Sequence, residues 1–356
     1  MDRILIFRIG HLGDTLVALP AIWAVRNAYP HAKLTYLSNA DPKNPHYVSA
    51  RNVLPEDGLL DDWMSYPANL GRWDTAKASL KLALEIRRRR FNAVIYLMTR
   101  NRTPEQIGRD LKFFRLAGIS NVIGAEYVRG NFLTTEIPKP TPEVESEGEF
   151  LLSSLRSGGI EVSDPAPPPE MLLTADEKAV AGDWLSRHFE PLSGRRLIAV
   201  APGSKWASKI WPAERFAEVG ERLIIHDNAF PVIFGGPEDR ERGDALIDHW
   251  NLGVNAAGEL NVREAAAALQ QCELYLGNDT GTMHLAAAVG TPCVAVFAAI
   301  DWIGRWKPFG KDNVIFRKRV ECEGCHTPDC FNNHKCLNLI EIDEVYKACH
   351  QVLKRH

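Results

Sequence analysis

The sequence predicts an α/β protein of two Rossmann-like domains, each built on a parallel sheet covered by helices. Three observations support this prediction. Apolar runs of strand length alternate with longer segments of helical period in both halves of the chain, as in parallel βαβ units. A length of 356 residues exceeds what one hydrophobic core usually organises. The proline-rich segment 164–170 cannot form a helix and indicates an interdomain linker.

The N-terminal half begins with the clearest βαβ pattern. Residues 3–9 are expected to form a buried strand and residues 14–29 a helix, which Pro30 ends. The other elements expected in this half are strands at 33–37, 91–98 and 121–124 and helices at 105–117 and before 91. The four arginines at 87–90 are interpreted as favourable charges at a helix C-terminus, with a nucleic-acid or membrane contact as the alternative. After residue 124 the pattern gives way to turn-rich, acidic sequence.

The alternation restarts after the linker. Thr174 is expected to cap a helix that runs to about residue 189, with Glu177 completing a capping box. Further strands are expected at 196–201, 231–234, 274–277 and 293–297. Further helices are expected at 213–225, 237–250, 262–271, 282–289 and 342–354. Two such domains joined by a linker are expected to hold a ligand in a cleft.

Composition and charge exclude several classes of protein. The 42 Lys and Arg residues against 45 Asp and Glu residues give a net charge of −3, which argues against a nucleic-acid-binding protein. A hydrophobic fraction of 45% and a charged fraction of 24% exclude wholesale disorder. No apolar run reaches the roughly 18 residues of a membrane span. The first segment lacks the features of a signal peptide, so we expect a cytoplasmic location.

The first candidate site is the loop that joins the first strand to the first helix. Gly10 and Gly13 allow the backbone to turn tightly and to approach a ligand, and His11 lies between them. Asp14 follows at the helix N-terminus, where a carboxylate can act as a general base. The alternative is that Asp14 only caps the helix. The dinucleotide-binding fingerprint and the P-loop lysine are both absent.

Two further strand-to-helix loops in the C-terminal half have the composition of anion sites. Residues 201–204, with Ser204, precede Lys209, so free amides and a point charge suit a phosphate; an ordinary loop with an exposed lysine is the alternative. Residues 277–284 would present amides at a helix N-terminus to a diphosphate. His284 could reach the same anion or be a buried, satisfied histidine.

In these three motifs the chain resembles glycosyltransferase family 9, the ADP-heptose:lipopolysaccharide heptosyltransferases. The matching segments are 4–15, 209–214 and 277–287. The resemblance implies a GT-B fold, with two Rossmann-like domains whose parallel sheets face an interdomain cleft. It implies that residues 1–168 bind the acceptor and residues 171–340 the donor. It also implies that a last helix within 341–356 packs back on the N-terminal domain.

The resemblance implies a role for each motif residue. Asp14 would be the catalytic base, with Gly10, His11 and Gly13 near the acceptor. The residues implied to bind the donor are Ser204, Lys209, Asp279, Thr280, Gly281, Thr282 and His284. Such enzymes invert the anomeric carbon and need no metal or cofactor for catalysis, and this chain has no convincing Asp-x-Asp motif.

The implied reaction moves a heptose from ADP-heptose to a cell-envelope glycan or glycolipid, such as the lipopolysaccharide inner core. Arg100, Arg102 and Arg109 suit a phosphate or carboxylate on the acceptor, although they match no lipopolysaccharide-core pattern. The alternatives are a transferase with another sugar-nucleotide donor or a different acceptor, and a noncatalytic nucleotide-sugar-binding protein. The presence of both Asp14 and Lys209 disfavours a noncatalytic protein. No nucleic-acid partner is expected. Contact with the inner face of the membrane and the oligomeric state stay open.

Four cysteines crowd into residues 322–336 with the spacing C-x2-C-x4-C-x5-C. They are Cys322, Cys325, Cys330 and Cys336. In a cytosolic chain this spacing favours a closed thiolate site for zinc, or iron, over disulfides. Disulfides and free thiols are the alternatives. Because the segment lies outside the expected ligand loops, we expect a structural site remote from the chemistry.

Overall fold

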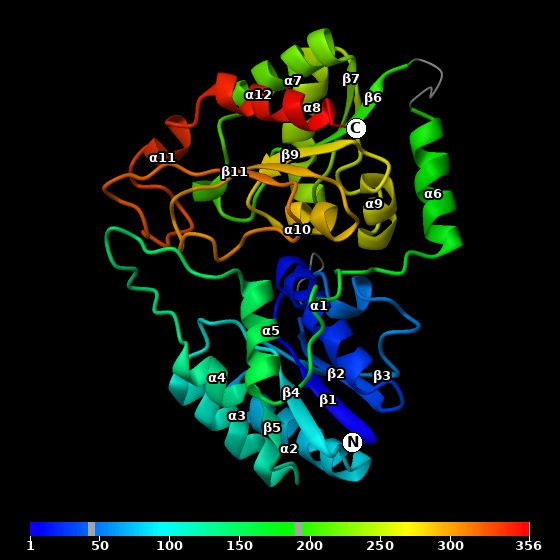
Figure 1. Cartoon of the computed structure of the whole chain (residues 1–356), viewed down its shortest axis with the longest axis vertical. Helices are drawn as coiled ribbons and strands as arrows, with labels where there is room; N and C mark the ends of the chain where they lie inside the picture. The colour runs from blue at the N-terminus through cyan, green and yellow to red at the C-terminus, as the bar shows by residue number, and fades with distance from the viewer. Residues whose placement is uncertain (42–46, 189–193, 356) are drawn as a thin grey trace. The chain divides into compact units, whose positions relative to one another are not determined.

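The computed structural model describes residues 1–41, 47–188 and 194–355, which form two compact units (Figure 1). The first unit comprises Met1–Thr135 and Glu145–Met171, and the second comprises Glu136–Val144 and Leu172–His356. Every described pairing between named strands is parallel. The predicted class, two Rossmann-like α/β domains of the GT-B type, is confirmed. The segment Glu136–Val144, expected in the first domain, instead belongs to the second unit.

The sheet of the first unit has five described strands in the order β3-β2-β1-β4-β5. Their bounds are β1 Arg3–Phe7, β2 Lys33–Ala40, β3 Asp62–Pro67, β4 Ala93–Tyr96 and β5 Val122–Ile123. Strand β1 is central, paired with β2 and β4, and helices cover both faces of the sheet. Ile4, Leu5 and Ile6 are therefore fully buried, which explains the apolar run. Sequence analysis missed β3, because only Met64 of this edge strand is buried.

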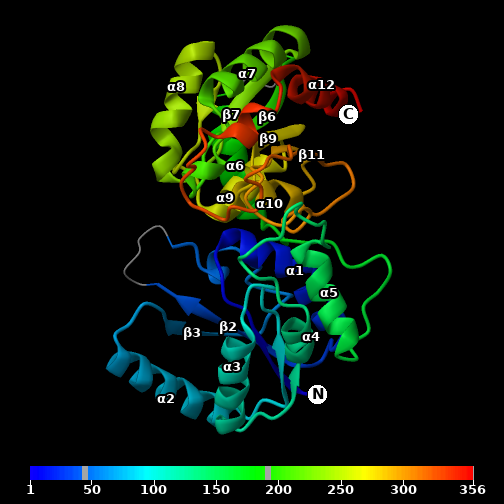
Figure 2. The same ribbon diagram turned by 90° about the vertical axis from the view of Figure 1, so that its left-hand side faces the viewer.

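Helices cover both faces of this first sheet. They are α1 Leu12–Ala28, α2 Arg72–Arg89, α3 Pro104–Leu116, α4 Ala125–Gly130 and α5 Glu147–Ser157, with a short 3₁₀ turn at Ala50–Asn52. Helix α1 packs against α5, and α3 packs against α2 and α4 (Figure 2). The arginine run ends α2, and Arg89 pairs with Asp62 at 2.6 Å, which confirms its structural interpretation. Helix α5 lies in the acidic segment where no helix was predicted.

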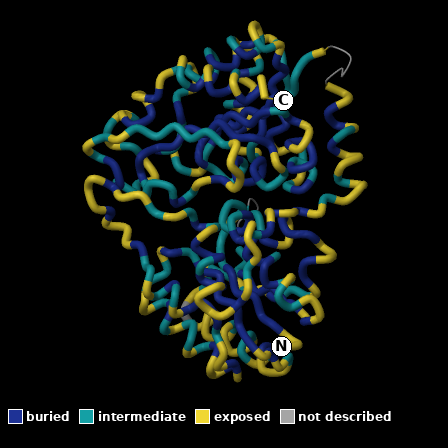
Figure 3. The backbone as a smooth tube through the Cα atoms, in the orientation of Figure 1, coloured by how far each residue is buried: buried dark blue, intermediate teal, exposed yellow. Residues whose placement is uncertain are grey.

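The sheet of the second unit has six described strands in the order β11-β10-β9-β6-β7-β8. Their bounds are β6 Arg196–Ala201, β7 Ala229–Ile233, β8 Val254–Asn255, β9 Leu274–Asn278, β10 Cys293–Val296 and β11 Val314–Phe316. The central strands β6, β9 and β10 are almost wholly buried, and the tube in Figure 3 shows this buried interior. The two edge strands β8 and β11 were not predicted; both are short and only half-buried.

Helices of the second unit fall into two packed groups. Their bounds are α6 Ala175–Ser186, α7 Ala213–Asp227, α8 Arg240–Trp250, α9 Val262–Leu269, α10 Gly281–Ala288, α11 Lys335–Asn338 and α12 Ile342–Leu353. Helix α7 packs against α8 and α12, while α9 packs against α6 and α10. Thr174 caps α6 as predicted, since its hydroxyl accepts from the Glu177 amide at 3.2 Å. The end expected near residue 189 lies outside the described residues.

The position of α12 corrects the prediction that the last helix packs on the N-terminal domain. Its apolar face, which includes Val345, Cys349 and Val352, lies instead in the core of the second unit beside α7, β9 and β10. Apolar residues at helical spacing give α12 one apolar face, and α7 supplies the neighbouring apolar surface. In the described part of the chain, no helix is both long and apolar enough to cross a bilayer.

Candidate active site

The β1–α1 loop places Asp14 in the first turn of α1. The His11 amide donates to Asp14 Oδ2 at 3.0 Å, so this carboxylate does cap the helix, as the alternative interpretation proposed. About a quarter of the side chain, 26%, stays exposed and open to a solute. Gly10 has a φ of +151°, and its Cα lies so close to Asp14 that a Cβ would overlap the carboxylate. Capping and base chemistry are therefore compatible in geometry.

Arg8, at the end of β1, is a positioning residue that sequence analysis missed. Its side chain is 1% exposed and donates to the Asp14 carbonyl at 2.6 and 3.1 Å and to the Leu97 carbonyl at 2.8 Å. Its Nη2 lies 3.7 Å from Asp14 Oδ1. The guanidinium thus ties the first turn of α1 to the sheet and puts a positive charge beside the carboxylate. The position of an arginine inside an apolar strand was the sequence feature that could have predicted a buried, hydrogen-bonded guanidinium.

We expect Gly10→Ala to destabilise the protein by about 1–3 kcal/mol, because the new Cβ meets both an unfavourable φ and the Asp14 side chain. Urea denaturation would measure this loss. Gly182→Ala is the matched control: it lies inside α6 with nothing near the new Cβ, so it should stabilise slightly. Equal effects of the two substitutions would contradict the close approach at Gly10.

The three arginines expected to bind the acceptor have different environments. Arg100 is 7% exposed, its guanidinium lies 4.8 Å from the centre of the Phe150 ring, and it donates to the Glu145 carbonyl at 3.4 Å. Arg102 forms two hydrogen bonds, at 2.7 and 2.8 Å, to the carboxylate of Asp110. Arg109 is exposed, and no hydrogen bond reaches its side chain within the described residues. Of these three arginines, Arg109 alone is exposed.

Lys209 and Asp279 form the central ion pair of the second unit. Lys209 Nζ lies 2.6 Å from Asp279 Oδ2, and the two side chains are 18% and 8% exposed. The alternative of an ordinary exposed lysine is therefore wrong. Asn278, which is fully buried, holds the two loops together: it donates to the Pro202 carbonyl at 2.9 Å and accepts from the Trp211 amide at 3.1 Å.

Helix α10 begins immediately after this pair. Thr280 is its N-cap and Gly281 its first residue, so the amides of Gly281 and Thr282 have no carbonyl partner within the helix. Thr280 Oγ1 is buried without a hydrogen-bond partner in the described structure. His284 is 6% exposed and its ring centre lies 6.3 Å from that of Trp306. The first turn of α10 thus presents donors where an anion is favoured.

The loop after β6 depends on an acidic residue that the sequence analysis did not select. Asp239 is 9% exposed and accepts from the Gly236 amide at 3.1 Å. Burial, with a smaller contribution from the charge of Glu238, raises the pKa of Asp239. A Cβ at Gly203 would overlap its carboxylate, which explains the glycine there. Ser204 accepts locally from the Trp206 amide at 3.3 Å.

The four clustered cysteines are free thiols in the structure, and no described cysteine forms a disulfide. Amide donors point at three of the sulfurs. The contacts are Asn332 N and His334 N to Cys330 Sγ (3.4 and 3.2 Å), Ala299 N to Cys336 Sγ (3.4 Å) and Asn332 Nδ2 to Cys322 Sγ (3.4 Å). Among residues 1–41, 47–188 and 194–355, no three His, Cys, Asp or Glu side chains are placed to hold a metal ion.

The cysteine segment is not remote from the ligand loops, contrary to our expectation. Ser208, which is 2% exposed, donates its amide to the Pro328 carbonyl at 2.9 Å and its hydroxyl to the Thr327 carbonyl at 2.6 Å. His334 Nε2 lies 3.0 Å from the Ala207 carbonyl. The cysteine segment therefore supports the backbone that carries Lys209. Long-range contacts of this kind have no signal in the spacing of the cysteines.

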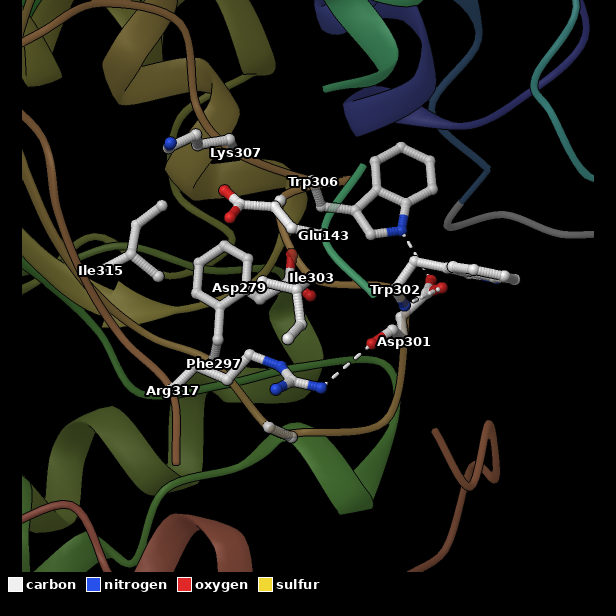
Figure 4. Close-up of a pocket in the computed structure, with 12 residues that line it drawn as sticks. Glu143, Asp279, Phe297, Asp301, Trp302, Ile303, Trp306, Lys307, Ile315 and Arg317 are labelled. Carbon is white, nitrogen blue, oxygen red and sulfur yellow. Dashed lines mark hydrogen bonds between the residues drawn. The ribbon is translucent and has the colours of Figure 1, made fainter. Parts of the chain in front are cut away.

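A pocket of about 200 Å³ opens beside the ion pair (Figure 4). Its lining includes Glu143, Asp279, Trp302, Trp306, Lys307 and Arg317. Asp301 accepts from Trp306 Nε1 at 2.8 Å and pairs with Arg305 at 3.3 Å. Burial alone would raise the pKa of Asp301, but the Arg305 charge and the Trp306 hydrogen bond hold it below its usual range.

Two Rossmann-like units, each built on a parallel sheet, define the GT-B class of fold. A solved glycosyltransferase family 9 structure from Veillonella parvula covers 100% of this chain, with 98% of that chain aligned, a TM-score of 0.76 and 21% identity. The structure of Escherichia coli ADP-heptose lps heptosyltransferase II covers 100%, with 99% of that chain aligned, a TM-score of 0.68 and 18% identity. At these identities the likeness establishes the fold.

The sequence comparisons establish the family. Residues 117–335, more than half of the chain, match the model of glycosyltransferase family 9 (heptosyltransferase), and the chain belongs to that family. Lipopolysaccharide heptosyltransferase 2 of Salmonella typhimurium is 30% identical over 135 residues. That alignment covers 36% of this chain and 37% of the relative. The matched segment thus spans little more than a third of that curated relative.

Proposed function

We propose that this protein transfers a heptose from ADP-heptose to a cell-envelope glycan, such as the lipopolysaccharide inner core, with inversion at the anomeric carbon and without a catalytic metal. The observation that carries the proposal is the Lys209–Asp279 pair, at 2.6 Å, immediately before the first turn of α10 in a family 9 chain. The names of the relatives, which include lipopolysaccharide and ADP-heptose heptosyltransferases, support the same donor and acceptor.

In this mechanism the second unit binds the donor and stabilises the leaving group. ADP gains negative charge as the glycosidic bond breaks, and the amides of Thr280, Gly281 and Thr282 together with Lys209 offset that charge. Asp279 holds Lys209 in place through their ion pair. Buried His284 supports the first turn of α10.

Asp14 takes the proton from the acceptor hydroxyl as that oxygen attacks the anomeric carbon. Arg8 holds Asp14 by its backbone carbonyl. Gly10, His11 and Gly13 are the loop residues proposed to lie near the acceptor. Arg109, whose guanidinium is exposed, is the arginine we retain for an acceptor phosphate or carboxylate. The proposed location is cytoplasmic, where nucleotide sugars are made available to such enzymes.

Calorimetry and a transfer assay together test the function. The purified full chain would be titrated with ADP, ADP-heptose, UDP-glucose and GDP-mannose, and then assayed for release of ADP with a heptose-accepting lipopolysaccharide core. We expect selective binding of the two adenine nucleotides and acceptor-dependent release of ADP. Preferential binding of another nucleotide sugar would mean that ADP-heptose is not the donor. Tight binding of ADP-heptose without any transfer would favour a noncatalytic binding protein.

A structural metal at the cysteines is a separate part of this proposal. Cys322, Cys325, Cys330 and Cys336 would hold zinc, or iron, as thiolates. Support comes from the amide donors directed at three of the sulfurs, since N–H groups stabilise a thiolate. Binding would require the thiolates to draw closer than in the described structure, where no metal-holding group is formed.

We expect Cys325→Ser to lower both the metal content and the melting temperature, because metal binding would stabilise the folded segment. ADP affinity should also fall, since this segment supports Ser208 and Lys209. Elemental analysis and thermal unfolding would measure these effects. The control is Cys272→Ser, at a buried thiol outside the cluster, which should lose stability but retain metal. Wild-type protein with only trace metal, and a melting temperature insensitive to chelators, would favour free thiols.

A further inference from the structure

The pocket of the second unit adjoins the expected position of the donor pyrophosphate. Asp279 lines this pocket and also pairs with Lys209 at 2.6 Å. In the proposed function the pyrophosphate lies at Lys209 and the first turn of α10, and the sugar is one ester bond from the β-phosphate. The group attached to the nucleotide therefore has this pocket within reach. The inference that follows rests on that proposed function.

The charges of the pocket favour a neutral polyol over a second anion. Most of its charged side chains are already compensated by ion pairs. These are Asp279–Lys209 (2.6 Å), Asp301–Arg305 (3.3 Å) and Arg317–Glu323 (3.4 Å). In the described structure no hydrogen bond or ion pair reaches the side chains of Glu143 and Lys307, which have opposite charges. No excess of positive charge is left to hold another phosphate.

The walls suit the two kinds of surface that a sugar ring presents. The rings of Phe297, Trp302 and Trp306 offer apolar area to the C–H groups of a sugar. Figure 4 shows the indole nitrogen of Trp306 directed at Asp301. The Glu143 carboxylate offers two acceptor oxygens to hydroxyl groups. Apolar faces with a small number of polar groups are typical of pockets for small polar ligands.

The backbone fixes the position of Glu143, although its side chain has no hydrogen-bond or ion-pair partner among the described residues. Glu143 belongs to the segment Glu136–Val144, which leaves the first unit and joins the second. Val144 N donates to the Ile303 carbonyl at 2.8 Å, and Glu143 forms a parallel bridge with Ile303. Gly304 has a φ of +84°, and a Cβ there would overlap the Val144 carbonyl, so the two segments pack closely. The backbone therefore holds Glu143 at the wall of the pocket.

We propose that this pocket is the donor-sugar subsite and that Glu143 is its specificity-determining residue. The Glu143 carboxylate accepts hydrogen bonds from sugar hydroxyls, while Trp302 and Trp306 pack against the ring. A charge-assisted hydrogen bond of this kind is strong enough to discriminate between sugars. ADP without a sugar does not occupy the pocket, so its affinity does not depend on Glu143.

The test compares ADP with ADP-heptose by calorimetry on Glu143→Gln and Glu143→Ala. We expect both variants to bind ADP like the wild type, and Glu143→Ala to bind ADP-heptose about tenfold more weakly or worse. The ratio of ADP-heptose to ADP-glucose affinity should also fall. Glu221→Gln, at an exposed position of α7, is the matched control and should change neither affinity. Melting temperatures would verify that each variant is folded.

The other outcomes overturn this inference or the function on which it rests, and they can be distinguished. Wild-type affinity for ADP-heptose with no loss in either folded variant would refute the role of Glu143 and leave the proposed function standing. An equal loss of ADP and ADP-heptose binding would assign Glu143 to the nucleotide instead. A wild-type protein that binds neither adenine nucleotide would refute the proposed function itself.

Discussion

Asp14→Asn is expected to reduce turnover by about 10²–10⁴-fold while leaving fold and ADP affinity nearly unchanged. Asparagine cannot take the proton of the sugar hydroxyl at neutral pH. Its amide oxygen can still accept the hydrogen bond that the His11 amide donates to Asp14 at 3.0 Å in the wild type. Arg8 also remains held by the carbonyls of Asp14 and Leu97. The loss should appear in kcat, measured by ADP release with saturating donor and acceptor.

Asp57→Asn is the matched control, because Asp57 is exposed and the described structure gives its side chain no hydrogen bond or ion pair. It should retain wild-type turnover. Calorimetry with ADP and thermal unfolding would show whether the Asp14 variant is intact. Near wild-type turnover in a folded Asp14→Asn protein would rule out Asp14 as the base and reduce its role to capping α1.

Lys209→Ala is expected to weaken ADP binding and to lower kcat by about 10²–10³-fold. The substitution removes the point charge beside the pyrophosphate and leaves Asp279, 8% exposed, as an uncompensated carboxylate. Both effects disfavour the anionic leaving group. Wild-type ADP affinity should also fall as the salt concentration rises, because part of the attraction is between charges. Calorimetry at two ionic strengths would measure the affinity and its salt dependence.

A double variant separates the two effects of losing Lys209. Lys209→Ala combined with Asp279→Asn removes the orphaned carboxylate, so stability should recover while ADP affinity stays low. Lys178→Ala, at an exposed position of α6, is the control for loss of a positive charge and should bind ADP normally. Full ADP affinity in the folded Lys209→Ala protein would show that Lys209 does not bind the pyrophosphate.

Local patterns predicted the interior elements better than the edges of the sheets. Strands β1, β6 and β9 are buried on both faces, so their apolar runs are visible in sequence. Strands β3 and β11 lie at sheet edges, where partial exposure removes that signal. The prediction that α12 packs on the N-terminal domain was wrong. The apolar face of the helix indicates that it packs against another apolar surface, but not which surface that is.

The sequence by itself determined the class of fold, the family resemblance and the three loops that carry Asp14, Lys209 and Asp279. Each of the three loops lies between a strand and the start of a helix, within about a dozen residues. Such a local order can be predicted from periodicity and residue type. The sequence predicted Lys209 and Asp279 as two separate donor-binding residues. It did not predict their ion pair, because 70 positions separate them along the chain.

Only the tertiary structure decided which distant residues support these loops. It brought the Leu97 carbonyl to Arg8, across 89 positions, and Asp239 against Gly203. It also brought the cysteine segment to Ser208, across 119 positions. It also brought Glu143 from the first half of the chain to a pocket of the second unit. These contacts depend on how the sheets order their strands, and a single sequence carries no local signal for partners that meet only after folding.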